Sequence, residues 1–312
     1  MDRREFLKKS ALAGAGLTLT SLGWPPTAWG GNSMKWGALA ETEENQNLMT
    51  ALTALETKVG RRFATAHARI KWETSLVNTF TTWSVDTGHV PIISWFSRKA
   101  AGGAVRWSSI ASGAHDSWIE HQAKTIKRAE WHAYIAFHKE PEDDTWIGTS
   151  AEYRAAHERI RHIFSKVGAK NLRWIVTLMA STYRVGQGAP RSWLPATYDI
   201  LGVDGYNRYR YADQPWKTFT DVFGAAHNCA TRKGKPLYVQ EYGCVEGEPG
   251  WKAAWIRDAT EVLKTWPEVV GVSYNNESGE SGLDAGCDYR LDTSSSSLSA
   301  FKAMGEDPRF QG

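Results

Sequence analysis

Two glutamates, Glu140 and Glu241, each follow an apolar run and could act together as a pair of carboxylates. Glu140 follows AYIAFHK, and Glu241 lies within PLYVQEYG. A carboxylate that ends a buried strand loses hydration, and a functional role is the usual reason for its presence. In such a pair, one protonated carboxyl can act as a general acid. An ionised carboxylate about 5–5.5 Å away can attack the acetal carbon of a sugar.

The residues around Glu140 suggest how its side chain is presented. A residue before a proline avoids right-handed helical geometry, so Pro141 predicts that Glu140 continues the strand in an extended conformation. Period-two alternation then places His138 and Glu140 on one face and Lys139 on the opposite side. A glutamate at a strand end can also be an ordinary solvated loop residue. We expect solvated loop positions for the three acidic residues that follow, which are Glu142, Asp143 and Asp144.

Short apolar runs alternate with longer amphipathic ones from residue 31 to residue 312, without a linker or a break in composition. The expected strands are 35–39, 63–66, 90–95, 133–138, 172–179, 200–206, 236–241 and 269–274. The main expected helices are 42–59, 72–82, 117–130, 150–167, 215–231, 251–264 and 298–304. Eight such units predict a single-domain α/β fold, the (β/α)8 TIM barrel. A doubly wound open sheet is the alternative, but GALAETEEN after the first strand is not a dinucleotide-binding fingerprint.

In a barrel of this kind, the active site lies at the carboxyl ends of the strands. Several predicted strands end in polar or aromatic residues, whereas their bodies are apolar. The endings are SW after strand three, HKEP after strand four, DGYN after strand six, QEYG after strand seven and YNNE after strand eight. The two glutamates would therefore face each other across the mouth of the barrel.

The motifs FHKEPEDD, VDGYN and QEYG, in this order and spacing, resemble glycoside hydrolase family 26. The resemblance covers residues 35–303 and implies a retaining β-glycoside hydrolase with a (β/α)8 barrel, β-mannanase-like and endo-acting on a β-linked polysaccharide of the mannan, glucan or xylan type. It also implies that Glu140 is the acid/base and Glu241 the nucleophile. Tyr206 matches a tyrosine that hydrogen-bonds the nucleophile in this clan.

The chain contains sixteen tryptophans. Their flat apolar faces suit sugar rings, although tryptophans also fill large cores. For Trp95, Trp72 and Trp146, stacking in sugar subsites and ordinary core or loop packing both remain open. The residues expected to contact substrate are His138, Trp95, Trp72, Trp146, His67, Asn207 and Tyr274.

Two departures from the family pattern bear on activity. Lys139 stands where the family usually has a histidine before the acid/base, and a nearby ammonium favours the ionised carboxylate, the wrong direction for a general acid. Tyr274 ends strand eight where a tryptophan platform is typical. These departures keep open an alternative function, a non-catalytic glycan-binding barrel derived from such an enzyme.

The first thirty residues read as an export signal and not as part of the fold. A basic start containing Arg3-Arg4 precedes an apolar run at 11–22 that is too short to span a bilayer. We expect a twin-arginine-type signal over 1–30, a mature domain over 31–312, and a secreted or periplasmic protein. A basic amphipathic helix is the alternative for this segment.

Removal of that segment would lower the formal charge from +3 to about +1. A near-neutral surface argues against nucleic acid or an anionic membrane as the main partner. The expected partner is a polysaccharide or oligosaccharide, bound by a monomer. No cofactor and no metal are expected, since the first strand lacks the His-x-His of metal-dependent barrel hydrolases.

The three cysteines are Cys229, Cys244 and Cys287. In an exported protein, one pair can be bridged while an odd cysteine stays free. The barrel order places Cys244 and Cys287 on the catalytic face and Cys229 on the opposite one. We therefore expect a Cys244–Cys287 disulfide.

Overall fold

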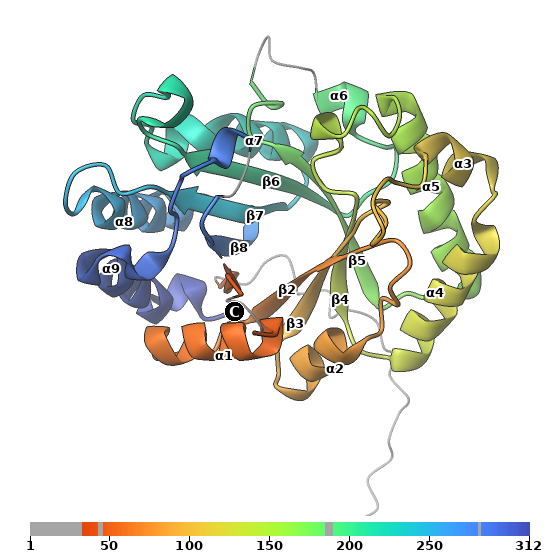
Figure 1. Ribbon diagram of the computed structural model, residues 1–312, viewed down its shortest axis with the longest axis horizontal. Coiled ribbons are helices and arrows are strands. Elements are labelled where there is room, and N and C mark those ends of the chain that lie inside the picture. The colour runs from red at the N-terminus through yellow and green to blue at the C-terminus, as the bar shows by residue number, and fades with distance from the viewer. Residues whose placement is uncertain (1–32, 43–45, 185–189, 280–281) are drawn as a thin grey trace, which may run out of the picture.

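The computed structural model describes residues 33–42, 46–184, 190–279 and 282–312. Eight parallel strands pair in chain order and close on themselves, with β1 (Lys35–Ala40) joined to β8 (Val269–Asn276). Helices form a layer around these strands (Figure 1). The predicted (β/α)8 barrel is confirmed. The expected signal segment lies outside the described residues.

The remaining strands and the helices occur largely where the apolar runs predict them. The other strands are β2 (Thr65–Ile70), β3 (Val90–Trp95), β4 (Ala133–Phe137), β5 (Leu172–Met179), β6 (Ile200–Asn207) and β7 (Leu237–Cys244). The helices are α1 (Leu48–Val59), α2 (Thr79–Asp86), α3 (Trp107–Ser112), α4 (Asp116–Ala129), α5 (Ser150–Val167), α6 (Pro190–Trp193), α7 (Phe219–Lys233), α8 (Trp251–Lys264) and α9 (Ser295–Glu306). None of the helices in the described part of the chain is both long and apolar enough to cross a bilayer.

Local sequence fixes where several helices begin and end. Thr149 and Thr218 each accept a hydrogen bond from the third residue of the following helix, whose acidic side chain bonds back to the cap. Such reciprocal caps satisfy amide groups that have no partner within the helix. Gly168 and Gly234 then end α5 and α7 in left-handed backbone geometry, which glycine adopts at little cost.

The barrel interior changes from apolar to polar towards the carboxyl ends of the strands. Tyr134 and Tyr238 meet inside an apolar cluster, with ring centroids 5.5 Å apart. Two residues further along β7, Gln240 donates to the Ser94 hydroxyl at 3.0 Å. Glu241 and Arg69 come next, joined by an ion pair of 3.0 Å. The apolar bodies of the strands thus support a charged layer at their carboxyl ends, called the upper layer below.

The second strand extends further than predicted, and this changes which residues reach the site. It ends at Ile70 instead of residue 66, and α2 begins at Thr79 instead of residue 72. In TAHARI, apolar Ala68 and Ile70 alternate with His67 and Arg69. This alternation is the signal of a half-polar strand, and it carries Arg69 to the upper layer.

The prediction of an extended Glu140 is wrong. β4 ends at Phe137, and both His138 (φ 46°) and Glu140 (φ 54°) adopt left-handed backbone geometry. The preference for extended backbone before proline is therefore overridden at Glu140. The His138 and Glu140 amides donate to the carbonyls of Trp95 and Thr177, both at 2.9 Å, which fixes the turn between the neighbouring strands.

The predicted Cys244–Cys287 disulfide is also wrong, since all three cysteines are buried free thiols. Cys244 packs in the main core, and its thiol donates to the Val245 carbonyl at 3.2 Å. Cys287 packs in a separate cluster with Val245 and Tyr289. Burial raises the pKa of both thiols, so both remain protonated at neutral pH.

Candidate active site

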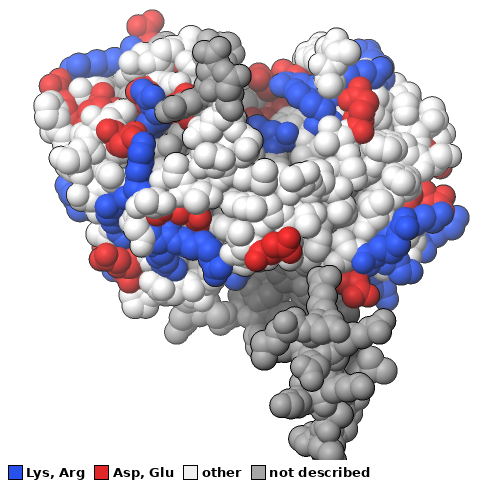
Figure 2. Space-filling view, turned by 60° about the horizontal axis from the view of Figure 1, so that its bottom comes forward, with Lys and Arg blue, Asp and Glu red and all other residues white. Residues whose placement is uncertain are grey.

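A cleft of about 710 Å³ lies at the carboxyl ends of the strands and contains both glutamates. Its lining is strongly polar. The charged side chains are Glu41, Arg69, Arg98, Lys139, Glu140, Asp143, Arg208, Glu241, Glu277 and Asp284, and the aromatic ones are Phe96, Tyr206 and Tyr289. The face of the molecule seen in Figure 2 also has basic and acidic side chains interspersed. No tryptophan is among the described residues that line this cleft.

Glu241 is aimed into the cleft by an irregularity in β7. Val239 pairs with Val203 and Glu241 with Asp204, so Gln240 is an extra residue relative to β6. A bulge of this kind locally re-aims side chains and is common near active sites. Both Gln240 and Glu241 therefore reach the interior, contrary to strict alternation along β7.

Three side chains hold Glu241. Arg69 Nη2 and Lys139 Nζ contact Oε1 at 3.0 and 2.6 Å, and the Tyr206 hydroxyl donates to Oε2 at 2.6 Å. Burial alone would raise the pKa of Glu241, but Arg69 and Lys139 outweigh it and hold that pKa well below its ordinary value. The geometry thus brings Tyr206 and Glu241 together as predicted and keeps Glu241 ionised.

Glu140 lies on the other side of the same ammonium group. Lys139 Nζ is 3.5 Å from Glu140 Oε2, and this carboxylate is partly exposed to the cleft. The prediction that Lys139 points away from Glu140 is wrong, because the left-handed turn at Glu140 brings both side chains into the cleft. Burial holds the pKa of Glu140 above its ordinary value, and Lys139 opposes that effect.

The position of Lys139 limits the distance between the two carboxylates. Its ammonium is 3.5 Å from Glu140 Oε2 and 2.6 Å from Glu241 Oε1, so these oxygens are at most about 6 Å apart. Carboxyl groups of inverting glycosidases are about 6.5–9.5 Å apart, whereas those of retaining enzymes are about 5–5.5 Å apart. The separation therefore fits direct attack by one carboxylate better than activation of a water between the two.

Four polar side chains from β2, β3, β5 and β7 form a layer beneath Glu241. His67 Nε2 lies 2.8 Å from the Ser94 hydroxyl and 3.2 Å from Gln240 Nε2, and the Thr177 hydroxyl donates to Gln240 Oε1. Burial lowers the pKa of His67 to about 3, so its imidazole is neutral. His67 is buried and absent from the cleft lining, so it supports the site from below.

His138 joins the loops after β3 and β4. Its Nδ1 accepts from the Ser97 amide at 3.1 Å, and its Nε2 therefore carries the proton that is donated to Asp144 at 2.7 Å. Asp144 also pairs with Arg98 at 2.6 Å. His138 is fully buried and absent from the lining, so it positions these loops without reaching the cleft.

Two of the three predicted acidic loop residues are not solvated. Asp144 is buried between His138 and Arg98. Glu142 accepts from the Met179 amide at 2.6 Å and from the Thr182 hydroxyl at 2.7 Å. Burial raises the pKa of Glu142 to about 7. Asp143 is exposed, as predicted, and lines the cleft.

The three tryptophan candidates separate into two kinds. Trp95 is fully buried, and its ring is stacked on that of Trp72 with centroids 4.7 Å apart and planes 5° apart. Neither ring can offer a face to a sugar in this arrangement, so core packing explains both. Trp146 is 53% exposed, and its Nε1 donates to Asp144 at 2.8 Å. It remains a candidate for a more distant subsite.

Asn207 and Tyr274 are also buried and absent from the lining. Asn207 donates to the Lys217 carbonyl at 2.9 Å, and this bond joins the end of β6 to the loop that follows it. The Tyr274 hydroxyl donates to the Tyr289 carbonyl at 2.8 Å. Tyr274 therefore supports Tyr289, which does line the cleft, and is not itself a platform for sugar.

Sequence reasoning did not predict the roles of three charged residues in the ion-pair network around Glu241. Arg69 joins Glu241 to Glu277 through ion pairs of 3.0 and 2.8 Å. Asp204, in the strand ending VDGYN, accepts from Lys139 at 2.7 Å. The alternation in TAHARI could have revealed Arg69, and the apolar run before Asp204 could have revealed a buried carboxylate. Glu277 follows β8 directly, but nothing in its sequence context predicts its partner.

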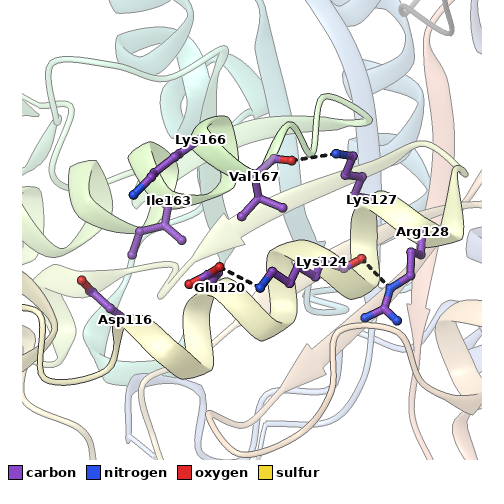
Figure 3. Close-up of a pocket in the computed structure, with 8 residues that line it drawn as sticks. All are labelled: Asp116, Glu120, Lys124, Lys127, Arg128, Ile163, Lys166 and Val167. Atoms are coloured by element: carbon purple, nitrogen blue, oxygen red, sulfur yellow. Dashed lines mark hydrogen bonds and ion pairs between the residues drawn. The ribbon is translucent and has the colours of Figure 1, made fainter.

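A second hollow, of about 630 Å³, lies on the helix layer between α4 and α5 and contains none of these residues (Figure 3). Lys127 donates to the Val167 carbonyl there at 3.0 Å, and Lys124 pairs with Glu120 at 2.8 Å. The lining of this hollow runs along both helices, from Asp116 at the start of α4 to Val167 at the end of α5, and shares no residue with the cleft. This hollow is therefore not part of the candidate active site. Within the described ranges, no group of three or more His, Cys, Asp or Glu side chains is placed to hold a metal ion.

Comparison with known sequences finds a distant relative. Endoglucanase H of Acetivibrio thermocellus is 23% identical over an alignment of 287 residues, which covers 87% of this chain and 30% of that protein. The chain thus spans less than a third of the length of this relative. No family model matches the chain.

Comparison with solved structures finds barrels of similar size. The catalytic domain of the Bacillus sp. JAMB-750 GH26 endo-β-1,4-mannanase aligns with a TM-score of 0.61 and 16% identity, covering 89% of this chain and 87% of that one. The GH26 β-mannanase of Bacteroides ovatus has a TM-score of 0.61 at 13% identity, covering 89% and 90%. The chain has the fold of the GH26 β-mannanases. The family resemblance inferred from FHKEPEDD, VDGYN and QEYG is confirmed at the level of this fold.

Proposed function

We propose that the chain is a retaining β-glycoside hydrolase that cleaves a β-linked polysaccharide of the mannan, glucan or xylan type in an endo manner. The observation that carries this proposal is the pair Glu140 and Glu241 in the cleft, with Glu140 Oε2 and Glu241 Oε1 at most about 6 Å apart. The activities named for the similar proteins, an endoglucanase and an endo-β-1,4-mannanase, support the same class of reaction.

Glu241 is the nucleophile in this proposal and Glu140 the acid/base. The ionised Glu241 attacks the anomeric carbon and forms a glycosyl ester, while Glu140 donates its proton to the departing oxygen. Glu140 then takes a proton from water, whose oxygen breaks the ester and restores Glu241. Tyr206 and Arg69 orient the nucleophile through its two oxygens.

Export belongs to the same proposal. A polysaccharide is too large to enter a cell intact, and the segment 1–30 has the sequence of a twin-arginine-type signal. We infer that residues 31–312 act as a monomer in the periplasm or outside the cell. Cell fractionation, with and without an Arg3→Lys/Arg4→Lys change, tests this: the double change is expected to keep the protein in the cytoplasm.

One observation favours a second candidate, a non-catalytic glycan-binding barrel. Lys139 pairs with Glu241 at 2.6 Å, and a carboxylate held this way is a weaker nucleophile than a free one. A panel of β-glycans separates the two functions. Hydrolysis by the wild type that is abolished by Glu140→Gln and by Glu241→Gln supports the enzyme, whereas binding without hydrolysis of any glycan supports the binding barrel.

A further inference from the structure

Lys139 is surrounded by carboxylates. Its ammonium lies 2.6 Å from Glu241 Oε1, 2.7 Å from Asp204 Oδ2 and 3.5 Å from Glu140 Oε2, and only 5% of its side chain is exposed. Burial alone would lower the pKa of Lys139, but Asp204, Glu140 and Glu241 outweigh it and hold that pKa above its ordinary value. A permanent positive charge therefore sits between the two catalytic candidates.

Backbone geometry places this charge. The left-handed residues His138 and Glu140 flank Lys139, and their amides are held by carbonyls of β3 and β5. Left-handed geometry at residues other than glycine costs free energy and persists where the surroundings enforce it, often at functional sites. The turn thus brings two successive side chains, Lys139 and Glu140, into the same cleft.

We propose that Lys139, anchored by Asp204, is a positioning residue that holds the nucleophile Glu241 and sets the pH range in which Glu140 carries its proton. The inference rests on the proposed hydrolase function. Unlike a histidine at the same position, a paired lysine does not lose its charge near neutral pH.

The two residues act on Glu140 in opposite directions. The Lys139 ammonium favours the ionised form of Glu140, whereas the Asp204 carboxylate offsets part of this positive charge. Asp204 is buried, and its Oδ1 has no hydrogen-bond partner among the described residues, so Lys139 is the partner that holds it there. The Lys139 ammonium, 2.7 Å away, opposes the effect of burial on the pKa of Asp204 and favours the ionised carboxylate.

Other titratable groups face this cluster and are left unsubstituted in the Lys139 and Asp204 variants. They are His67 and Arg69 from β2, Glu142 and Asp143 from the turn after β4, Tyr206 from β6, Glu241 from β7 and Glu277 from β8. Each single substitution therefore removes one charge from the same set of neighbouring residues.

The experiment compares Lys139→Met, Asp204→Asn and the double variant with the wild type. The midpoint of Glu140 titration is read by 13C NMR of carboxyl-labelled glutamate, with the signal assigned by its loss in Glu140→Gln. Lys139→Met is expected to raise this midpoint by about one to three pH units, because a cation near the carboxyl is lost. Asp204→Asn is expected to lower it by about one unit. The double variant should fall between the two single variants.

Lys124→Met is the matched control, since Lys124 is an exposed lysine paired with Glu120 on α4. Its Glu140 midpoint should equal that of the wild type. The alkaline limb of kcat/KM, measured on whichever β-glycan the wild type cleaves, should move with the midpoint in each variant.

Equal midpoints in the wild type and Lys139→Met, or shifts of the two single variants in the same direction, would overturn the inference. If Lys139→Met does not fold, Asp204→Asn decides the outcome, because an unchanged or raised midpoint contradicts the anchoring role. If the midpoints shift as expected but no glycan is cleaved, the proposed hydrolase function fails while the electrostatic role of Lys139 stands.

Discussion

The hydroxyl of Tyr206 offers a sharp test of how the nucleophile is held. Tyr206→Phe removes one oxygen and leaves the ring stacked on Tyr289, with centroids 4.8 Å apart. The lost bond to Glu241 Oε2 is 2.6 Å long and charge-assisted. Hydrogen bonds to charged groups contribute about 1.5–3 kcal/mol, and each 1.4 kcal/mol is tenfold in rate, so kcat/KM should fall by roughly 10- to 150-fold.

The assay is initial-rate hydrolysis of the best β-glycan substrate, with circular dichroism as a check of folding. Tyr183→Phe is the matched control, because it removes a buried hydroxyl that donates to the Gly202 carbonyl at 2.8 Å without contacting Glu241. This control should lower the free energy of unfolding by about 1 kcal/mol and change kcat/KM by less than about twofold. A Tyr206→Phe enzyme as active as the wild type would refute the reasoning.

Three further outcomes are expected. Since burial raises the pKa of Glu142 to about 7, the folded state binds this proton more tightly than the unfolded state. The free energy of unfolding should therefore fall by about 2–3 kcal/mol as the pH rises from 4.5 to 7, and Glu142→Gln should flatten this part of the denaturation profile. Trp95→Ala should cost about 3–5 kcal/mol of stability in urea titrations, whereas Trp146→Ala should leave stability within about 0.5 kcal/mol and raise KM by up to about tenfold. All three cysteines should react with iodoacetamide in urea without a reductant. If mass spectrometry finds two cysteines that were not alkylated, the predicted disulfide is correct after all.

Much of the fold could be predicted from the sequence, because eight apolar runs with amphipathic segments between them leave few architectures. The two glutamates were found for a related reason, since Glu140 comes shortly after a buried strand and Glu241 lies within one. The error at β2 arose from counting only continuous apolar residues. The alternation in TAHARI marks a strand with one polar face, and that face contains Arg69.

The geometry around Glu140 could not be predicted from local sequence. The rule for residues before proline favours extended backbone, and contacts elsewhere in the fold override it here. The contacts are made by the carbonyls of Trp95 and Thr177, which come from strands far away in the chain. The burial of Trp95 against Trp72 is also a tertiary property, because the same residue type suits both a core and a sugar subsite.

The configuration of the first product tests the central claim most directly. The β-glycan cleaved best is digested in D2O and followed by 1H NMR, so that the anomeric signal is recorded before mutarotation. Because Glu140 Oε2 and Glu241 Oε1 are at most about 6 Å apart, the first-formed reducing end should be the β-anomer. An α-anomer formed first would contradict the mechanism.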